Sequence, residues 1–251
     1  MKNNVLKMQD QAQSNNKRRD FLKLSGMVIV GSGLLMACSN DDDGPNTPPD
    51  SNVFDLGAGN LGILNYAYAL EQLEAAFYTN VLDGSYWAGA PANEKQILED
   101  LYNHEIIHRE FFRTAISSVA PNDIVPDLEF DFSGVDFSSR ASVLGTSKVL
   151  EDTGVAAYNG AGQLISVADA AGIAYLTLAG KIVSVEARHA SAISDLLNPG
   201  SMDFAGDDVL IGLLGGVKSF DKALPPSAIL AAVVGTGFVV TPFTANNLPT
   251  S

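Results

Sequence analysis

The 251-residue sequence contains little cysteine and few basic residues, and each shortage excludes a class of protein. Its one cysteine, Cys38, rules out a disulfide framework and a zinc site built from thiolates. Its 15 lysines and arginines stand against 29 aspartates and glutamates, which gives a formal net charge of −14. Because an acidic surface repels a phosphate backbone, we expect no nucleic-acid partner.

The first 37 residues have the composition of an export signal. Arg18 and Arg19 precede an apolar stretch at 24–37, which is too short to span a bilayer as a mature helix. The arginine pair followed by "DFLK" resembles a twin-arginine export signal. The sequence "LMAC" at 35–38 resembles a lipoprotein processing site, which would leave Cys38 lipidated at the start of the mature chain. We therefore expect an exported protein whose lipid anchors it to the membrane of the cell envelope, on the periplasmic side or at the cell surface.

The rest of the chain divides into a linker, a bundle and a tail. Residues 38–57 are rich in Asp, Asn, Pro and Ser and cannot bury a core, so they form the polar linker. Residues 58–200 carry the helices, and the Gly-rich extension at 201–251 holds a short helix at 225–234 that we expect to pack on the bundle. Without residues 1–37 the chain has nine basic and 27 acidic residues, a charge of −18 that favours the solubility of an exported protein.

Four segments show the apolar periodicity of helices, at about 60–83, 92–119, 138–158 and 168–197. The loops within the first and second pairs, "GSYWAGAP" and "NGAGQLISV", are short, whereas the connection at 120–137 is long. Short loops join antiparallel neighbours, and a long connection can return along the bundle and start the next helix in the same direction. The sequence therefore predicts an all-α, ferritin-like four-helix bundle with one long crossover and a short C-terminal helix.

Two of the three histidines follow a glutamate by three positions within these helices. Glu105 precedes His108, and Glu186 precedes His189. Residues at this spacing share one face of a helix, and here that face is otherwise apolar. A buried carboxylate without a partner is costly, so each of these pairs needs a counter-charge.

The other two helices supply more carboxylates. Glu151 lies on the third helix, while Glu71 and Glu74 both lie in apolar rows of the first, so the choice between them stays open. One Glu from each of two helices and a Glu-x-x-His from each of the others is the ligand set of di-iron and di-manganese carboxylate bundles. Carboxylates can bridge two cations, and imidazole suits iron. We predict a site for two iron ions, or manganese, built from Glu71, Glu74, Glu105, His108, Glu151, Glu186 and His189.

The remaining polar residues of the helices receive simpler interpretations. His104 lies off the apolar face, and we expect it at the surface or beside a ligand. The tyrosines are more often core aromatics with a polar tip than redox neighbours of a metal. These are Tyr66, Tyr68, Tyr78, Tyr102 and Tyr158.

Four stretches of the sequence resemble the ferritin-like family that includes exported bacterial proteins and plant desiccation-related proteins. They are "ILNYAYALEQLEAAFY" (63–78), "HEIIHREFF" (104–112), "VLEDTGVAAYNGA" (149–161) and "VEARHA" (185–190), and together they span about residues 60–200. The resemblance implies a four-helix fold with metal ligands at Glu71 or Glu74, Glu105, His108, Glu151, Glu186 and His189. It implies no single reaction.

Two kinds of function fit these observations. The first is a di-metal oxidoreductase of ferroxidase or peroxidase type, which oxidises Fe(II) or reduces peroxide or dioxygen and whose catalytic residues the sequence does not identify. The second is a metal-free bundle with a structural, stress-protection or binding role in the cell envelope. A storage cage is a poorer interpretation, because a lipid anchor and the extra tail would hinder assembly of a closed shell. A homodimer stays open.

Overall fold

The computed structural model describes residues 53–206, 209–213 and 217–250. All of them belong to one unit, Pro48–Ser251. The expected export signal, Cys38 and most of the expected linker lie outside the described residues.

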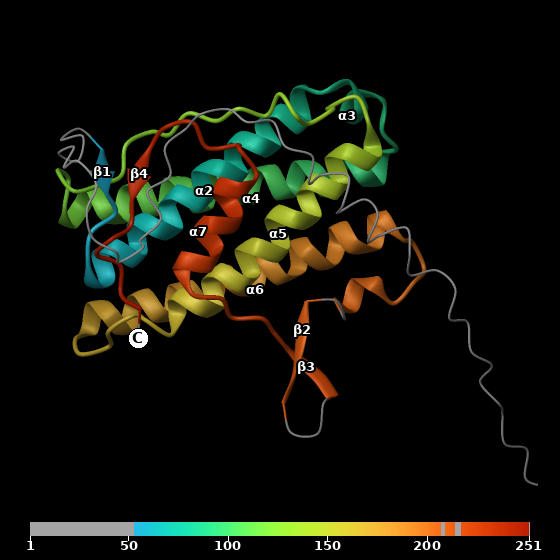
Figure 1. Cartoon of the computed structure of the whole chain (residues 1–251). Coiled ribbons are helices and arrows are strands. Elements are labelled where there is room, and N and C mark those ends of the chain that lie inside the picture. The colour runs from blue at the N-terminus through green and yellow to red at the C-terminus, as the bar shows by residue number, and fades with distance from the viewer. Residues whose placement is uncertain (1–52, 207–208, 214–216, 251) are drawn as a thin grey trace, which may run out of the picture. The chain divides into compact units, whose positions relative to one another are not determined.

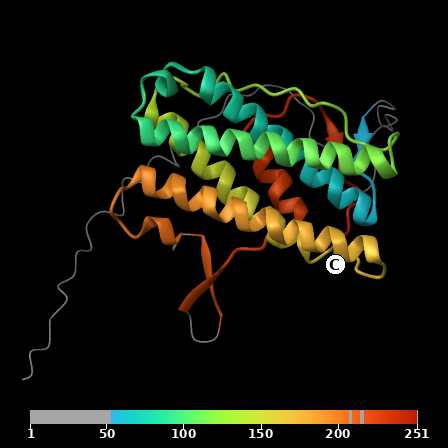
Figure 2. The same cartoon turned by 180° about the vertical axis from the view of Figure 1, so that it is seen from behind.

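Four long helices form the bundle, and they are α2 (Gly59–Asp83), α4 (Ala92–Val119), α5 (Arg140–Gly162) and α6 (Ala170–Leu197). A short helix, α3 (Ser85–Gly89), lies in the loop between the first two. The helices pack as two hairpins, α2 with α4 and α5 with α6 (Figure 1). The chain between α4 and α5 returns along the bundle, so these two helices run in the same direction (Figure 2). The predicted ferritin-like bundle with one long crossover is confirmed.

Local signals set the ends of the helices. Ser139 and Asp169 cap α5 and α6, where their side chains accept hydrogen bonds from the backbone N–H groups three residues on, at 3.4 and 2.8 Å. Both helices therefore begin two residues later than the sequence suggested, because the capping residue stays outside the helix. Helix α5 also continues to Gly162, four residues beyond its expected end.

Helix α2 is buried on nearly every side, because the crossover covers the face that the other helices leave open. Two amides in the helix attach the crossover. The side chain of Asn65 accepts a hydrogen bond from Val125 N at 2.9 Å and donates to Asp123 O at 2.7 Å. The side chain of Gln72 accepts from Leu128 N at 2.8 Å. These buried polar side chains thus serve the backbone of the crossover, which would otherwise lack partners.

The C-terminal extension adds two small sheets and a helix to the bundle. Strand β1 (Phe54–Asp55) pairs in parallel with β4 (Phe243–Thr244), and β2 (Leu210–Leu213) forms an antiparallel pair with β3 (Val217–Asp221). A 3-10 turn, η1 (Asp203–Ala205), precedes β2. The folded unit therefore begins by residue 54, inside the segment that the sequence assigned to the linker (38–57), because pairing with β4 gives this backbone its partners.

Helix α7 (Pro226–Gly235) is the predicted short C-terminal helix, and it lies against α5. Just before it, the carbonyl of Leu224 approaches Gly160 so closely that a side chain at position 160 has no room. The backbone N–H of Leu224 donates to Ala156 O at 3.1 Å. The tail is therefore fixed to the bundle by backbone contacts as well as by α7.

By length and composition alone, α6 is apolar enough to cross a membrane. One face of it, however, carries Glu186 and His189 into the bundle, where both are buried. Charged side chains on the packed face are what a bundle helix with an internal polar site presents. We therefore interpret α6 as a helix of the bundle that buries one face and leaves most of its apolar N-terminal part exposed.

Candidate metal centre

Side chains from all four long helices meet in one buried space. They are Glu71 of α2, Glu105 and His108 of α4, Glu151 of α5, and Glu186 and His189 of α6, and we call them the six-residue cluster. The four glutamates have no exposed surface, and the two histidines are 8% and 3% exposed. Each helix contributes from near its middle, so the cluster is enclosed by the bundle.

One half of the cluster gathers around His108. Its Nδ1 atom lies 3.1 Å from Glu186 Oε1 and 3.4 Å from Glu105 Oε2. The third carboxylate oxygen is Glu71 Oε2, also at 3.4 Å. Together with Nδ1 these three oxygens offer four candidate ligand atoms, all within 4.8 Å of one another.

The other half gathers around His189 in the same way. Its Nδ1 atom lies 2.9 Å from Glu105 Oε1 and 3.6 Å from Glu186 Oε2. Glu151 Oε2 lies at 3.2 Å. Glu105 and Glu186 therefore present one oxygen to each half, whereas Glu71 and Glu151 each serve one half. Two shared carboxylates, two terminal carboxylates and one imidazole per half form a donor set that can hold two cations side by side.

These eight atoms share a second property. Each is a buried polar atom without a hydrogen-bond partner among the described residues, although nearly all such atoms in proteins have one. The atoms are Nδ1 of both histidines, both oxygens of Glu105 and Glu186, and Oε2 of Glu71 and Glu151. The orphaned atoms of the cluster are therefore the same eight that converge into the two halves.

The remaining oxygens of the terminal carboxylates are held by tyrosines across the bundle. The hydroxyl of Tyr158 on α5 donates a hydrogen bond to Glu71 Oε1, and the hydroxyl of Tyr78 on α2 donates one to Glu151 Oε1. Burial, and the carboxylate that each contacts, raise the pKa of both tyrosines, so both keep the proton that they donate. The sequence interpretation favoured core aromatics over redox neighbours of a metal and did not identify these hydrogen bonds, because no local pattern shows which carboxylate a tyrosine will meet.

Glu74 lies beside the cluster and belongs to neither half. It is 3% exposed, and its burial and the neighbouring carboxylates raise its pKa well above the usual range. Gly154 of α5 makes room for it, since a Cβ at that position would lie 3.1 Å from Glu74 Oε1 and 3.5 Å from Glu186 Oε2. Of the two candidates on α2, the structure thus brings Glu71 into the cluster and places Glu74 next to it.

The ionisable groups of the cluster lie close enough to shift one another's pKa values. Burial raises the pKa of Glu105, and the nearby Glu186 raises it further, to well above its usual range. Burial also raises the pKa of Glu151, to about 7, although His189 opposes the shift. Burial acts against charge on Glu186 too, but His108 and His189 lower its pKa to about 2. Protons on the imidazoles and on some carboxylates thus offset the negative charge of the metal-free cluster.

The pKa values of the two histidines are shifted in the direction that favours their charged forms. Burial alone would lower the pKa of His108, but the facing carboxylates raise it to about 12, and they raise that of His189 as well. His189 has one more contact, because its Nε2 lies 2.8 Å from Nδ1 of the exposed His104, whose ring stacks on it. The sequence interpretation allowed His104 a place at the surface or beside a ligand, and it occupies both.

A family model for the ferritin-like domain matches residues 59–199, which is more than half of the chain. The chain therefore belongs to the ferritin-like domain family. The matched range contains all four long helices and the whole six-residue cluster. No curated protein matches the sequence.

Proposed function

We propose that the six-residue cluster binds two divalent ions of iron or manganese and that the loaded protein is an oxidoreductase acting on dioxygen or peroxide. The observation that carries the proposal is the set of eight buried, unpartnered ligand atoms, divided evenly between the two halves. Four carboxylates bring four negative charges, and two divalent cations with neutral imidazoles cancel them. The donor set thus fits the ions in number, in charge and in ligand type.

Bound iron or manganese would supply electrons for reducing dioxygen or peroxide, and Fe(II) is itself oxidised in doing so. The chain's own residues prepare the site. Glu105 and Glu186 hold both halves at a fixed separation, since each spans them with its two oxygens. Tyr78 and Tyr158 fix the terminal carboxylates by hydrogen bonds to the oxygens that face away from the cluster.

His104 orients one of the two imidazoles. For Nδ1 of His189 to act as a ligand, the proton of that ring must sit on Nε2 and be donated to Nδ1 of His104. Burial lowers the pKa of His104, which favours the neutral ring that can accept this hydrogen bond. A partner of this kind fixes both the tautomer and the orientation of a histidine ligand.

The test is metal content, measured by elemental analysis after anaerobic loading with Fe(II) or Mn(II). Wild type should hold about two ions per chain, the number that this ligand set binds. Glu186→Ala removes an oxygen from each half and should lose most of the metal. Asp195→Ala, an exposed acidic position on the same helix, should keep it. Dioxygen or peroxide consumption by the loaded protein tests the reaction.

Failure would take two forms. If wild type binds no metal under these conditions, the cluster is vestigial, and a structural or binding role in the cell envelope replaces the enzyme. If wild type binds metal but consumes neither dioxygen nor peroxide, the metal-binding part stands and the oxidoreductase part is wrong.

We also propose that the protein is exported and lipid-anchored at Cys38, a proposal supported by the sequence alone. A twin-arginine signal suits a metalloprotein, because that route carries folded proteins and allows loading before export. Cell fractionation of Cys38→Ser tests the anchor. The variant should leave the membrane fraction or remain unprocessed, and unchanged processing with unchanged membrane association would contradict the proposal.

A further inference from the structure

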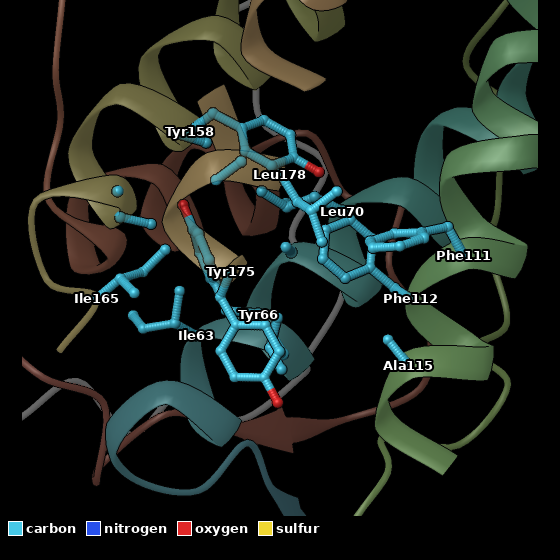
Figure 3. Close-up of a pocket in the computed structure, with 16 residues that line it drawn as sticks. Ile63, Tyr66, Leu70, Phe111, Phe112, Ala115, Tyr158, Ile165, Tyr175 and Leu178 are labelled. Atoms are coloured by element: carbon cyan, nitrogen blue, oxygen red, sulfur yellow. The ribbon is translucent and has the colours of Figure 1, made fainter. Parts of the chain in front are cut away.

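An apolar cavity that is partly open to solvent lies in the bundle next to the six-residue cluster. It has a volume of about 140 Å³, and all four long helices contribute to its wall. Figure 3 shows Leu70 of α2, Phe111 and Phe112 of α4, Tyr158 of α5 and Leu178 of α6 around it. The lining is aliphatic and aromatic, with no charged side chain among the residues that form it. Such a space repels ions and offers water few partners.

The size of the cavity limits its occupant. A cavity of about 150 Å³ lined by Leu, Ile and Phe stays dry in another protein and takes up benzene or xenon. The space here has nearly this volume and the same kind of wall. Small residues create it, among them Ala115 of α4 and Ala179 of α6, where a larger side chain would fill the gap.

Tyr158 connects the cavity to the cluster. Its ring lines the cavity, and its hydroxyl donates to Glu71, one of the terminal carboxylates. Phe112, which also lines the cavity, lies one turn beyond His108 on α4. Its ring is stacked with that of Tyr158, and the two ring centroids lie 6.5 Å apart. Tyr158 and Phe112 therefore lie between a molecule in the cavity and the six-residue cluster.

We propose that this cavity binds a small, uncharged, apolar molecule, up to about the size of benzene, on the Glu71 side of the cluster. The physical reason is that an empty apolar space forfeits dispersion contacts, which an apolar guest restores without disturbing any hydrogen bond. Binding of the guest does not depend on the metal. Its use as the entrance for dioxygen or for an apolar substrate rests on the proposed function.

The experiment uses xenon as the probe, followed by ¹²⁹Xe chemical shift in solutions of the purified, metal-free protein. Wild type should show saturable binding at one site. Ala179→Leu and Ala115→Leu both place a larger side chain in the cavity and should weaken xenon binding by at least about tenfold. Ala174→Leu makes the same change at an exposed position of α6 outside the cavity, and it should bind as wild type does.

Two filling variants guard against loss of fold in one of them, and circular dichroism checks each. Absence of saturable xenon binding in wild type, or equal binding in a folded filling variant, overturns the proposal. A benzene titration by calorimetry identifies the size class: binding of both probes admits a hydrocarbon, and binding of xenon alone restricts the guest to the size of dioxygen. Metal uptake by the same protein, assayed separately after anaerobic loading with Fe(II) or Mn(II), separates the outcomes. Xenon binding by a protein that takes up no metal refutes only the proposed function, and metal uptake without xenon binding refutes only the cavity.

Discussion

Glu94 and the four glutamates of the six-residue cluster are all buried, but their surroundings neutralise their charge in different ways. Glu94, near the start of α4, is 7% exposed and meets Arg140 of α5, whose Nη2 and Nε atoms lie 2.7 and 2.9 Å from its Oε1. Tyr86 donates to its other oxygen at 2.6 Å. The hydrogen bonds from Arg140 lower the pKa of Glu94 despite burial. This carboxylate is thus neutralised by a cation of the chain itself.

Among the described residues, the glutamates of the six-residue cluster pair with no arginine or lysine. In the described part of the chain, their ion pairs are with His108 and His189 only. Burial and like charge raise the pKa of Glu105, the reverse of what Arg140 does for Glu94. The fold can therefore place an arginine against a buried glutamate, and at the cluster it places histidines and further carboxylates instead. The difference supports the proposal that bound cations supply the positive charge of the cluster.

The largest effect should follow from breaking the internal pair. Arg140→Met leaves Glu94 buried with Tyr86 as its one remaining partner and removes the hydrogen bond to Leu196 O at the end of α6. The side chain of Arg140 is 40% exposed and that of Glu94 10% exposed, so water screens the pair in part and lowers the cost of breaking it to about 2 kcal/mol. The lost hydrogen bond to Leu196 O adds about 1 kcal/mol, so the free energy of unfolding should fall by about 3 kcal/mol. Denaturant titration measures it, with the exposed Arg188→Met as the control. Metal content should not change in either variant, and its loss in Arg140→Met would contradict the separation of the two groups.

Metal loading should stabilise only through the cluster. An ion present at about 100 times its dissociation constant raises the free energy of unfolding by about 2.7 kcal/mol. For a domain of this size, that increase raises Tm by about 5–10 °C. Differential scanning calorimetry with and without Mn(II) gives the shift. Glu105→Gln should abolish it, while Glu99→Gln, the same change at an exposed position of α4, should keep it. An equal shift in both variants would place the ions elsewhere.

The four-helix architecture was predictable because long apolar periodicity and loop lengths are local properties. The short loops between paired helices and the long crossover after Val119 are enough to define the order and direction of the four helices. The pairing of β1 with β4 was not predictable, since it joins residues nearly the whole unit apart and neither segment has a strand pattern of its own.

The cluster was predictable for the same reason, except at α2. Glu105 with His108 and Glu186 with His189 are recognisable by their spacing, and Glu151 is a glutamate of the third helix in the same register. On α2 the crossover buries the outward face as well, so Glu71 and Glu74 both lie in apolar rows and periodicity cannot separate them. The tyrosine partners and the cavity depend on contacts between helices, for which a single sequence contains no signal.

Two tyrosines sharpen the comparison at a smaller scale. Tyr78 donates to Glu151 in the cluster, and Tyr86 donates to Glu94 in the internal pair. Tyr78→Phe should weaken metal binding by about 10–100-fold, as loss of a partner to a ligand commonly does, whereas Tyr86→Phe should leave the affinity unchanged. Competition with a chelator measures both.

For His104→Ala we expect metal affinity to fall by less than about tenfold, because water can replace an exposed partner of His189. Equal affinity in all three variants would contradict the roles of Tyr78 and His104.

In the metal-free protein, Glu151 and His108 of the cluster should give a pH dependence of stability opposite in sign to that of Glu94 and Glu186, whose lowered pKa values act only at lower pH. The folded pKa of Glu151 is raised from 4.5 to about 7 and that of His108 from 6.5 to about 12, so the folded state holds protons that the unfolded state releases. Their contribution to stability is complete at low pH and is lost as pH rises through these windows. The lowered pKa of Glu94 acts in the opposite sense and loses its contribution only as pH falls below 4.5.

With a chelator present, stability should therefore decline from pH 5 to pH 8, as measured by denaturant titration at each pH. Glu105→Gln should reduce the decline, because it removes one of the coupled carboxylates. Metal affinity should rise over the same interval, since the ligands bind metal in their deprotonated forms. A metal-free protein that is equally or more stable at pH 8 would contradict these charge assignments in the cluster.

Anomalous diffraction from Mn(II)-loaded crystals decides whether two cations occupy the two halves of the six-residue cluster. We expect two anomalous peaks, one beside Nδ1 of His108 and the other beside Nδ1 of His189, each in contact with Glu105 and Glu186. If crystals soaked in excess Mn(II) show no peak in the cluster, with the eight ligand atoms unchanged in position, the cluster does not bind metal.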